Sequence, residues 1–197
     1  AGSNSGSVGV AYHNITDQNL KDVLQKVDTS AGQTMVSNAI DALAASGATR
    51  TDLGLDMAQR ILSANPVQPN EKRSRVVIVF TDGAPTSFNG FEKDVADNAI
   101  TYAGTIKTTG ATVYTIGIFA GANAVSAGTE PSGDLDQNSK SMNSACNWFM
   151  QQVSSNNGTP RTPSYYLSAA DAGSLSSIFQ QISDNIETGG SSSTLTE

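Results

Sequence analysis

Hydrophobic residues along the chain follow two spacings that alternate. Short runs from Val76 to Phe80 and from Thr112 to Phe119 are rich in β-branched and aromatic residues and end near glycines. Such runs are typical of strands that are buried on both faces of a parallel sheet. Between them, from Phe91 to Lys107, apolar residues recur at helical spacing. The three segments predict a strand–helix–strand unit with a right-handed crossover.

The alternation continues toward both ends of the chain. Short strands are predicted from Ser7 to Tyr12 and from Ser164 to Ser168, and the stretch from Gly121 to Ser139 has the composition of a long loop. Further helices are predicted at Met35–Ala45, from Leu53 to a stop near Asn65 and Pro66, at Met142–Val153, and at Leu175–Ile186. Together these elements predict an α/β fold with a doubly wound, Rossmann-like, mostly parallel sheet and helices on both faces.

The charged and reactive side chains exclude several classes of function. The 197 residues include 18 acidic and 11 basic ones, and the net charge of −7 argues against a nucleic-acid partner. The single cysteine, Cys146, rules out a cysteine zinc site, and the single histidine, His13, makes a Ser-His-Asp triad improbable. No apolar run is long enough for membrane insertion. Because no pair of nucleophile and base is evident, we expect a binding protein and not an enzyme.

One candidate site lies where a strand ends. Asp82 follows the run that begins at Val76, and Thr49 follows a glycine ahead of a predicted helix. Ligands of open parallel sheets bind beyond the carboxyl ends of the strands, and hydroxyl and carboxylate oxygens suit a hard divalent cation. Asp82 could instead cap backbone amides in a turn, and either Thr51 or Asp52 could be the N-cap of the helix.

The stretches from Gly47 to Ala58 and from Val76 to Gly83, followed by Val113–Ala120 and Tyr165–Ala172, resemble the von Willebrand factor A domain family, in the form found on Gram-positive surface and pilus-tip proteins. The resemblance implies a metal-ion-dependent adhesion site with Thr49 and Asp82 as metal ligands. It implies weakly bound Mg²⁺, or Mn²⁺ or Ca²⁺, whose coordination a partner's carboxylate completes. The surface around this site would include Thr51, Gly83, Thr86, Asp134 and Asp136. Adaptable loops at 84–90 and 121–139 would frame it.

The family also carries an Asp-x-Ser-x-Ser run after a first strand, and no such strand and run precede the matching motifs here. We therefore expect residues 1–188 to form an N-terminally incomplete domain, followed by a linker-like tail at 189–197. A sheet without its central strand would expose unpaired edges. The strand could come from a missing N-terminal segment of the same precursor or from another copy, or the chain could rearrange one of its own ends.

The leading hypothesis is an extracellular adhesion module on a bacterial cell surface or cell wall, with a pilus tip as one location. Its partner would be a host or matrix protein that offers a carboxylate to the cation. The alternative is a structural or assembly subunit that completes its sheet with a strand from another chain and whose metal site is vestigial.

Overall fold

The computed structural model describes residues 20–21, 23–24, 26–43, 47–71, 73–169 and 172–191. The predicted strand at Ser7–Tyr12 and His13 lie outside these residues. In chain order the elements are α1 (Ser30–Asp41), α2 (Thr51–Ala64), β1 (Val76–Thr81), α3 (Lys93–Thr108), β2 (Thr112–Gly117), α4 (Met142–Val153), β3 (Tyr166–Ser168), a 3-10 turn (Ala172–Ser174) and α5 (Leu175–Ser191).

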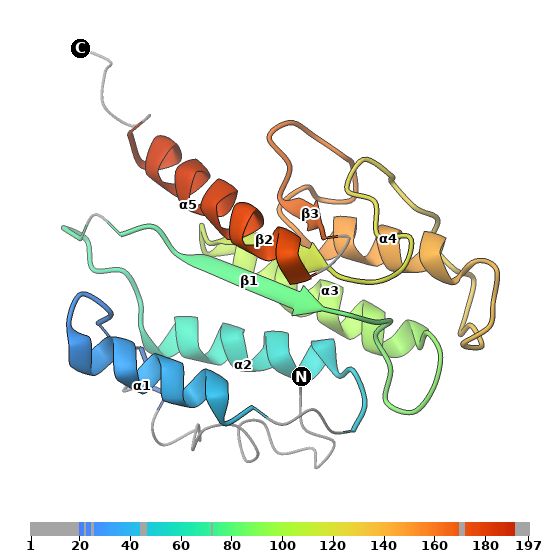
Figure 1. Cartoon of the computed structure of the whole chain (residues 1–197), viewed down its shortest axis with the longest axis horizontal. Helices are drawn as coiled ribbons and strands as arrows, with labels where there is room; N and C mark the ends of the chain where they lie inside the picture. The colour runs from blue at the N-terminus through green and yellow to red at the C-terminus, as the bar shows by residue number, and fades with distance from the viewer. Residues whose placement is uncertain are drawn as a thin grey trace.

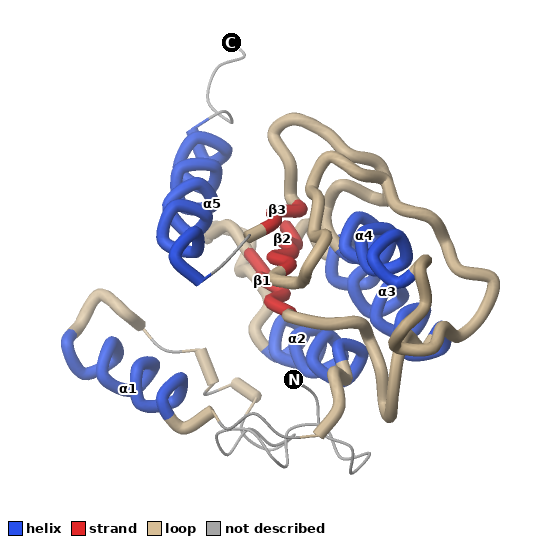
Figure 2. Tube along the Cα trace, turned by 45° about the vertical axis from the view of Figure 1, so that its right-hand side comes forward, coloured by secondary structure: helices blue, strands red, loops and turns tan. Residues whose placement is uncertain are grey.

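The described strands form one parallel sheet in the order β1-β2-β3. Val76 of β1 pairs with Thr112 of β2, and Thr115 of β2 pairs with Tyr166 of β3. Helices α2, α3 and α4 lie on one face of the sheet and α5 lies on the other (Figures 1 and 2). The predicted α/β fold with helices on both faces of a parallel sheet is therefore confirmed.

Each face of the sheet has its own apolar core. Small residues of α3 such as Ala99 and Ala103 are fully buried, which allows α2 and α3 to approach β1 and β2 closely. On the opposite face, Ile178 and Ile182 of α5 pack against β2 and β3. Successive side chains of β2 point alternately into the two cores, so its residues from Val113 onward are buried. The continuous apolar run of this strand predicts such burial.

The apolar run of β1 also predicts a strand buried on both faces, and this prediction is wrong for one of them. Val77 and Val79 pack against the core formed with α2, α3 and α4, but Ile78 is 41% exposed and Phe80 is 51% exposed. Within the described sheet β1 is an edge strand, and α5 covers mainly β2 and β3. An apolar strand thus presents one face and its outer edge to open space among the residues that the structure describes.

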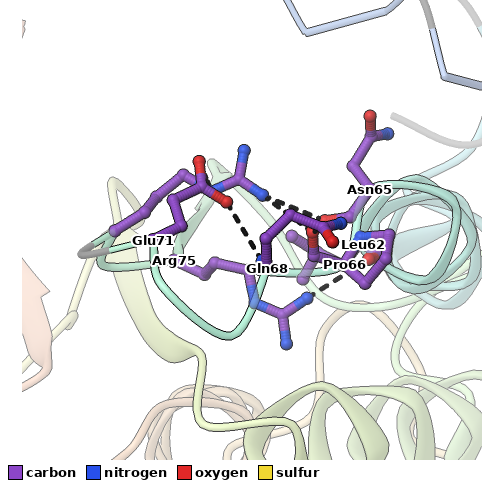
Figure 3. A network of polar contacts seen from close by, with 7 residues as sticks. Leu62, Asn65, Pro66, Gln68, Glu71 and Arg75 are labelled. Carbon is purple, nitrogen blue, oxygen red and sulfur yellow. Dashed lines mark hydrogen bonds and ion pairs between the residues drawn. The ribbon is translucent and has the colours of Figure 1, made fainter.

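A polar network fixes the connection from α2 to β1 (Figure 3). The guanidinium of Arg75 donates to the Leu62 carbonyl at 3.2 Å and to the Thr109 carbonyl at 2.8 Å, which joins the ends of α2 and α3. Within the connection, the Gln68 amide donates to the Glu71 carboxylate at 3.2 Å. These bonds set where β1 begins and therefore where its carboxyl end lies.

The predicted helix boundaries differ from the structure most at α1, which ends at Asp41 and not at Ala45, and at the end of α5. Helix α1 begins at Ser30, ahead of the apolar periodicity, because the hydroxyl of Thr29 accepts from the Gly32 amide at 3.2 Å and caps the helix. Helix α5 continues to Ser191 and so enters the stretch expected to be a linker. Helix α4 spans the predicted residues, and Cys146 on it is buried, as expected.

Candidate functional site

The carboxyl end of β1 is folded by its own last residue. The buried hydroxyl of Thr81 donates to the Gly83 carbonyl at 3.1 Å and accepts from the Gly83 amide at 3.3 Å. This tight turn leaves Asp82 exposed. Within the described part of the chain, the Asp82 carboxylate accepts no hydrogen bond and makes no ion pair. Asp82 is therefore not the turn-capping carboxylate that the sequence left open, and its oxygens are available to a ligand.

Thr49 lies beside this turn. A Cβ atom placed on Gly83 would lie 3.8 Å from the Thr49 hydroxyl oxygen. The Thr49 carbonyl accepts from the Thr86 amide and from the Thr51 amide, both at 3.0 Å, and these two bonds fix the segment against the loop after β1. The structure therefore brings Thr49, Asp82 and Gly83 together at the carboxyl end of β1.

An open groove of about 520 Å³ begins at this end and follows β1. Thr49, Thr51 and Asp82 line its polar end. Its length is lined by apolar residues of α2 and β1, among them Leu55, Ala58, Ile78 and Phe80. The candidate oxygen ligands thus lie at the mouth of an apolar groove and not in an enclosed cavity.

The start of α2 differs from the prediction. Its N-cap is Arg50, without a side-chain capping bond, so neither Thr51 nor Asp52 caps the helix. Asp52 is buried and instead forms a two-pronged ion pair with Arg50, with Nε–Oδ1 at 2.8 Å and Nη2–Oδ2 at 2.7 Å. The hydrogen bond to Asp52 raises the pKa of the Arg50 guanidinium above its ordinary value. Both charges beside the site are therefore used in pairing with each other.

The hydroxyl of Thr86 is used in the loop after β1. It donates to the Glu92 carboxylate at 3.1 Å, and the Ser87 hydroxyl also donates to that carboxylate. The amide of Phe88 donates to Glu92 as well, at 2.9 Å. Hydrogen bonding, foremost from Ser87, lowers the pKa of Glu92 to about 2 in spite of partial burial. Thr86 is near the site, but its side chain shapes the loop.

Asp134 and Asp136 do not line the groove. The Asp134 carboxylate accepts from the Lys93 amide at 2.8 Å, at the start of α3, where an acidic group stabilises the helix. The carbonyl of Asp136 accepts from the Ser139 amide at 2.8 Å in the turn ahead of α4. The structure therefore gives Asp134 a capping role and separates both residues from the groove around Thr49 and Asp82.

The loop that follows β2 is more firmly held than its Gly, Ser and Asn content suggests. The Asn147 side chain accepts from the Asn123 amide at 2.8 Å and donates to the Gly121 carbonyl at 2.9 Å. The hydroxyl of Tyr166 donates to the same Asn147 oxygen at 2.7 Å. The Gln151 amide donates to the carbonyls of Ala124, at 2.9 Å, and Ser126, at 3.0 Å. This buried network contradicts the expectation that the loop is adaptable.

The donor set fits a hard cation, but sparsely. A hydroxyl and an unpaired carboxylate are oxygen donors of the kind that Mg²⁺ prefers, and Mg²⁺ commonly keeps several waters when few protein oxygens bind it. No group of three or more His, Cys, Asp or Glu side chains placed to hold a metal ion occurs among the described residues. The arrangement therefore suits a weakly held cation with open coordination positions.

Comparison with known proteins identifies the family. The von Willebrand factor type A domain matches residues 4–181, most of the chain. The chain belongs to this family, whose members act in general as binding modules. No curated protein and no solved structure matches it. The helices within the described residues are all too short or too polar to cross a membrane.

Proposed function

We propose that this chain is an extracellular adhesion module that recognises a carboxylate of a partner protein through a divalent cation. One observation supports the proposal above all others. Thr49 and Asp82 come from segments far apart in sequence and meet at the carboxyl end of β1, where the Asp82 carboxylate has no partner among the described residues. The donors are oxygens, and they line the polar end of an open groove.

In this proposal Asp82 and Thr49 hold the cation, which is Mg²⁺ or alternatively Mn²⁺ or Ca²⁺. When bound, the cation supplies a Lewis-acidic position for a carboxylate oxygen of the partner. The chain supplies the positioning. The Thr86 and Thr51 amides fix the backbone of Thr49, and the Thr81 hydroxyl fixes the turn that carries Asp82. The site binds and does not catalyse in this proposal.

The location of the module is proposed from composition and family. Domains of this family are often extracellular or secreted. The chain is rich in Ser, Thr, Asn and Gly and poor in Lys, which suits an extracellular surface. The motifs resemble those on Gram-positive surface and pilus-tip proteins, so we propose a cell-wall or pilus location and a host or matrix protein as partner.

Titration with Mn²⁺, followed by the electron paramagnetic resonance signal of the free ion, tests the site. We expect one site in the wild type that is at least tenfold weaker in Asp82→Asn, because the single protein carboxylate is lost. Asp136→Asn is the matched control, because Asp136 is also exposed and lies outside the groove. Equal Mn²⁺ binding by wild type and both variants would contradict the proposal.

A second candidate function rests on the outer edge of β1. The carbonyls of Arg75 and Thr81 accept from β2, so in a parallel pair the backbone groups of Val76, Ile78 and Phe80 point away from β2. Among the described residues nothing pairs with them. In this alternative, a strand from another copy of the chain adds at this edge, and the metal site is vestigial.

Sedimentation velocity separates the two candidates. Strand exchange between copies predicts a concentration-dependent oligomer that is insensitive to cations and is disrupted by Ile78→Lys, because a charge on an edge strand opposes strand addition. A monomer at all concentrations, in both the presence and the absence of Mg²⁺, would contradict exchange between copies.

A further inference from the structure

A phenylalanine stands almost fully exposed on the loop that follows the candidate cation ligand Asp82. Phe88 is 90% exposed, the largest fraction among the exposed large hydrophobic residues of the described chain. It lies at the tip of the loop from Gly83 to Gly90, between β1 and α3. A single exposed apolar residue is common on protein surfaces. The way in which this loop is held distinguishes Phe88 from such a residue.

The Glu92 carboxylate clasps the tip of the loop. It accepts hydrogen bonds from the Phe88 amide at 2.9 Å, from the Thr86 hydroxyl at 3.1 Å and from the Ser87 hydroxyl. The Phe88 amide also lies 3.1 Å from the Thr86 hydroxyl oxygen. Hydrogen bonds to a charged group are stronger than those between neutral groups. The backbone that carries Phe88 is therefore fixed although its side chain is in solvent.

Backbone bonds anchor the loop as well. The Thr86 amide donates to the Thr49 carbonyl at 3.0 Å, which ties the loop to the candidate cation ligand. At its end, Phe91 exchanges backbone bonds with Leu135, at 2.8 and 2.9 Å. Gly90 has φ of +73°, and a Cβ there would lie 2.0 Å from the Leu135 carbonyl oxygen. The close approach at this end thus requires glycine.

These bonds hold the backbone of the loop, in contrast to the adaptable loop at 84–90 that the sequence predicted. The exposed ring is therefore pre-organised for contact, because little backbone entropy remains to be lost on binding. Phe88 follows Thr86 by two residues, and Thr86 contacts Thr49. We propose that Phe88 is an apolar anchor for the partner, which is a peptide segment that carries a large apolar side chain in addition to the acidic side chain that the cation takes. This inference rests on the proposed function and names the class of partner.

Two probes test the proposal by NMR titration in Mg²⁺: N-acetyl-Asp-Gly-amide and N-acetyl-Asp-Leu-amide. For the wild type we expect the leucine probe to bind about five- to tenfold more tightly than the glycine probe, because the leucine side chain is partly buried against the Phe88 ring. Phe88→Ala removes this advantage and leaves the affinity for the glycine probe unchanged. Val125→Ala is the control, because Val125 is 82% exposed on a different loop, and it keeps the advantage.

A third variant tests whether the Glu92 hydrogen bonds that position Phe88 matter in addition to the ring itself. Glu92→Gln keeps the Phe88 ring and weakens the clasp. It therefore reduces the advantage of the leucine probe over the glycine probe and speeds hydrogen exchange at the Phe88 amide. Equal affinity of wild type for the two probes, or a leucine advantage that survives Phe88→Ala, would overturn the role of Phe88 and leave the proposed function intact. If neither probe binds in Mg²⁺, the proposed function fails and the role of Phe88 fails with it.

Discussion

Gln151 offers a quantitative test of how firmly the loop after β2 is held. Its side chain is fully buried and makes three hydrogen bonds: to the carbonyls of Ala124 and Ser126, and from the Asn156 amide at 2.6 Å. Gln151→Met keeps the length of the side chain and removes all three bonds. At about 1 kcal/mol for each neutral hydrogen bond, the loss is about 3 kcal/mol of unfolding free energy. For a chain of this size that corresponds to a fall of roughly 6–12 °C in Tm.

Differential scanning calorimetry measures this change, and hydrogen exchange locates it. Gln152→Met is the matched control, because the side chain of Gln152 makes no hydrogen bond among the described residues. Faster exchange is expected at the Asn123 amide, which donates to Asn147 of α4, and at the Val125 amide, which donates to the Asn123 side chain within the loop. If Gln151→Met melts within about 2 °C of the control, less than the effect of one hydrogen bond, the network does not hold the loop.

Three further outcomes follow from the same structure. Gly90→Ala is expected to lower the unfolding free energy by more than about 2 kcal/mol, because a Cβ there meets the Leu135 carbonyl at a positive φ. Gly104→Ala, in open space on α3, should instead raise the unfolding free energy by up to about 1 kcal/mol. Urea unfolding of both variants measures the contrast. Burial raises the pKa of the Cys146 thiol to about 12, so iodoacetamide at pH 8 should modify it only after unfolding, and rapid modification of the folded protein would refute its burial. Because the pKa of Glu92 is lowered to about 2 in the folded state, its stabilising effect is complete above the ordinary value of 4.5 and is lost as the pH falls toward 2; the difference in Tm between wild type and Glu92→Gln should therefore shrink over that interval, and a constant difference would contradict the clasp.

The meeting of Thr49 and Asp82 could be predicted from the sequence, because parallel strands place ligands at their carboxyl ends and the family motif supplies the threonine. The Glu92 clasp could not, because its donors converge only when the loop from Thr86 to Phe88 folds. Asn147 and Gln151 gave a partial signal, since two amides one helical turn apart lie among apolar residues of α4. Their partners in the loop, Asn123 and Ala124, are more than 20 residues away in sequence, beyond the reach of a local pattern.

The exposed face of β1 is another feature that could not be predicted from the sequence. Five consecutive apolar residues predict burial on both faces, and the pattern cannot say which element covers each face. In the structure α2, α3 and α4 cover Val77 and Val79, while Ile78 and Phe80 stay open. The loop from Gly121 to Ser139 shows the converse, because a composition typical of an adaptable loop is fixed by buried side chains from α4 and β3.

The most direct test of a cation at Thr49 and Asp82 is the thermal unfolding midpoint of wild type and Asp82→Asn, each measured in EDTA and in Mg²⁺. A ligand that binds only the folded state stabilises it according to its concentration and affinity, so about 10 mM Mg²⁺ and a Kd of about 1 mM give roughly 1.4 kcal/mol, or about 3–6 °C. We predict that rise for the wild type and a rise of no more than about 2 °C for Asp82→Asn, whose tenfold weaker binding leaves at most about 0.4 kcal/mol. The same response to Mg²⁺ in both proteins, whether a rise or no change, would contradict a cation site at the end of β1.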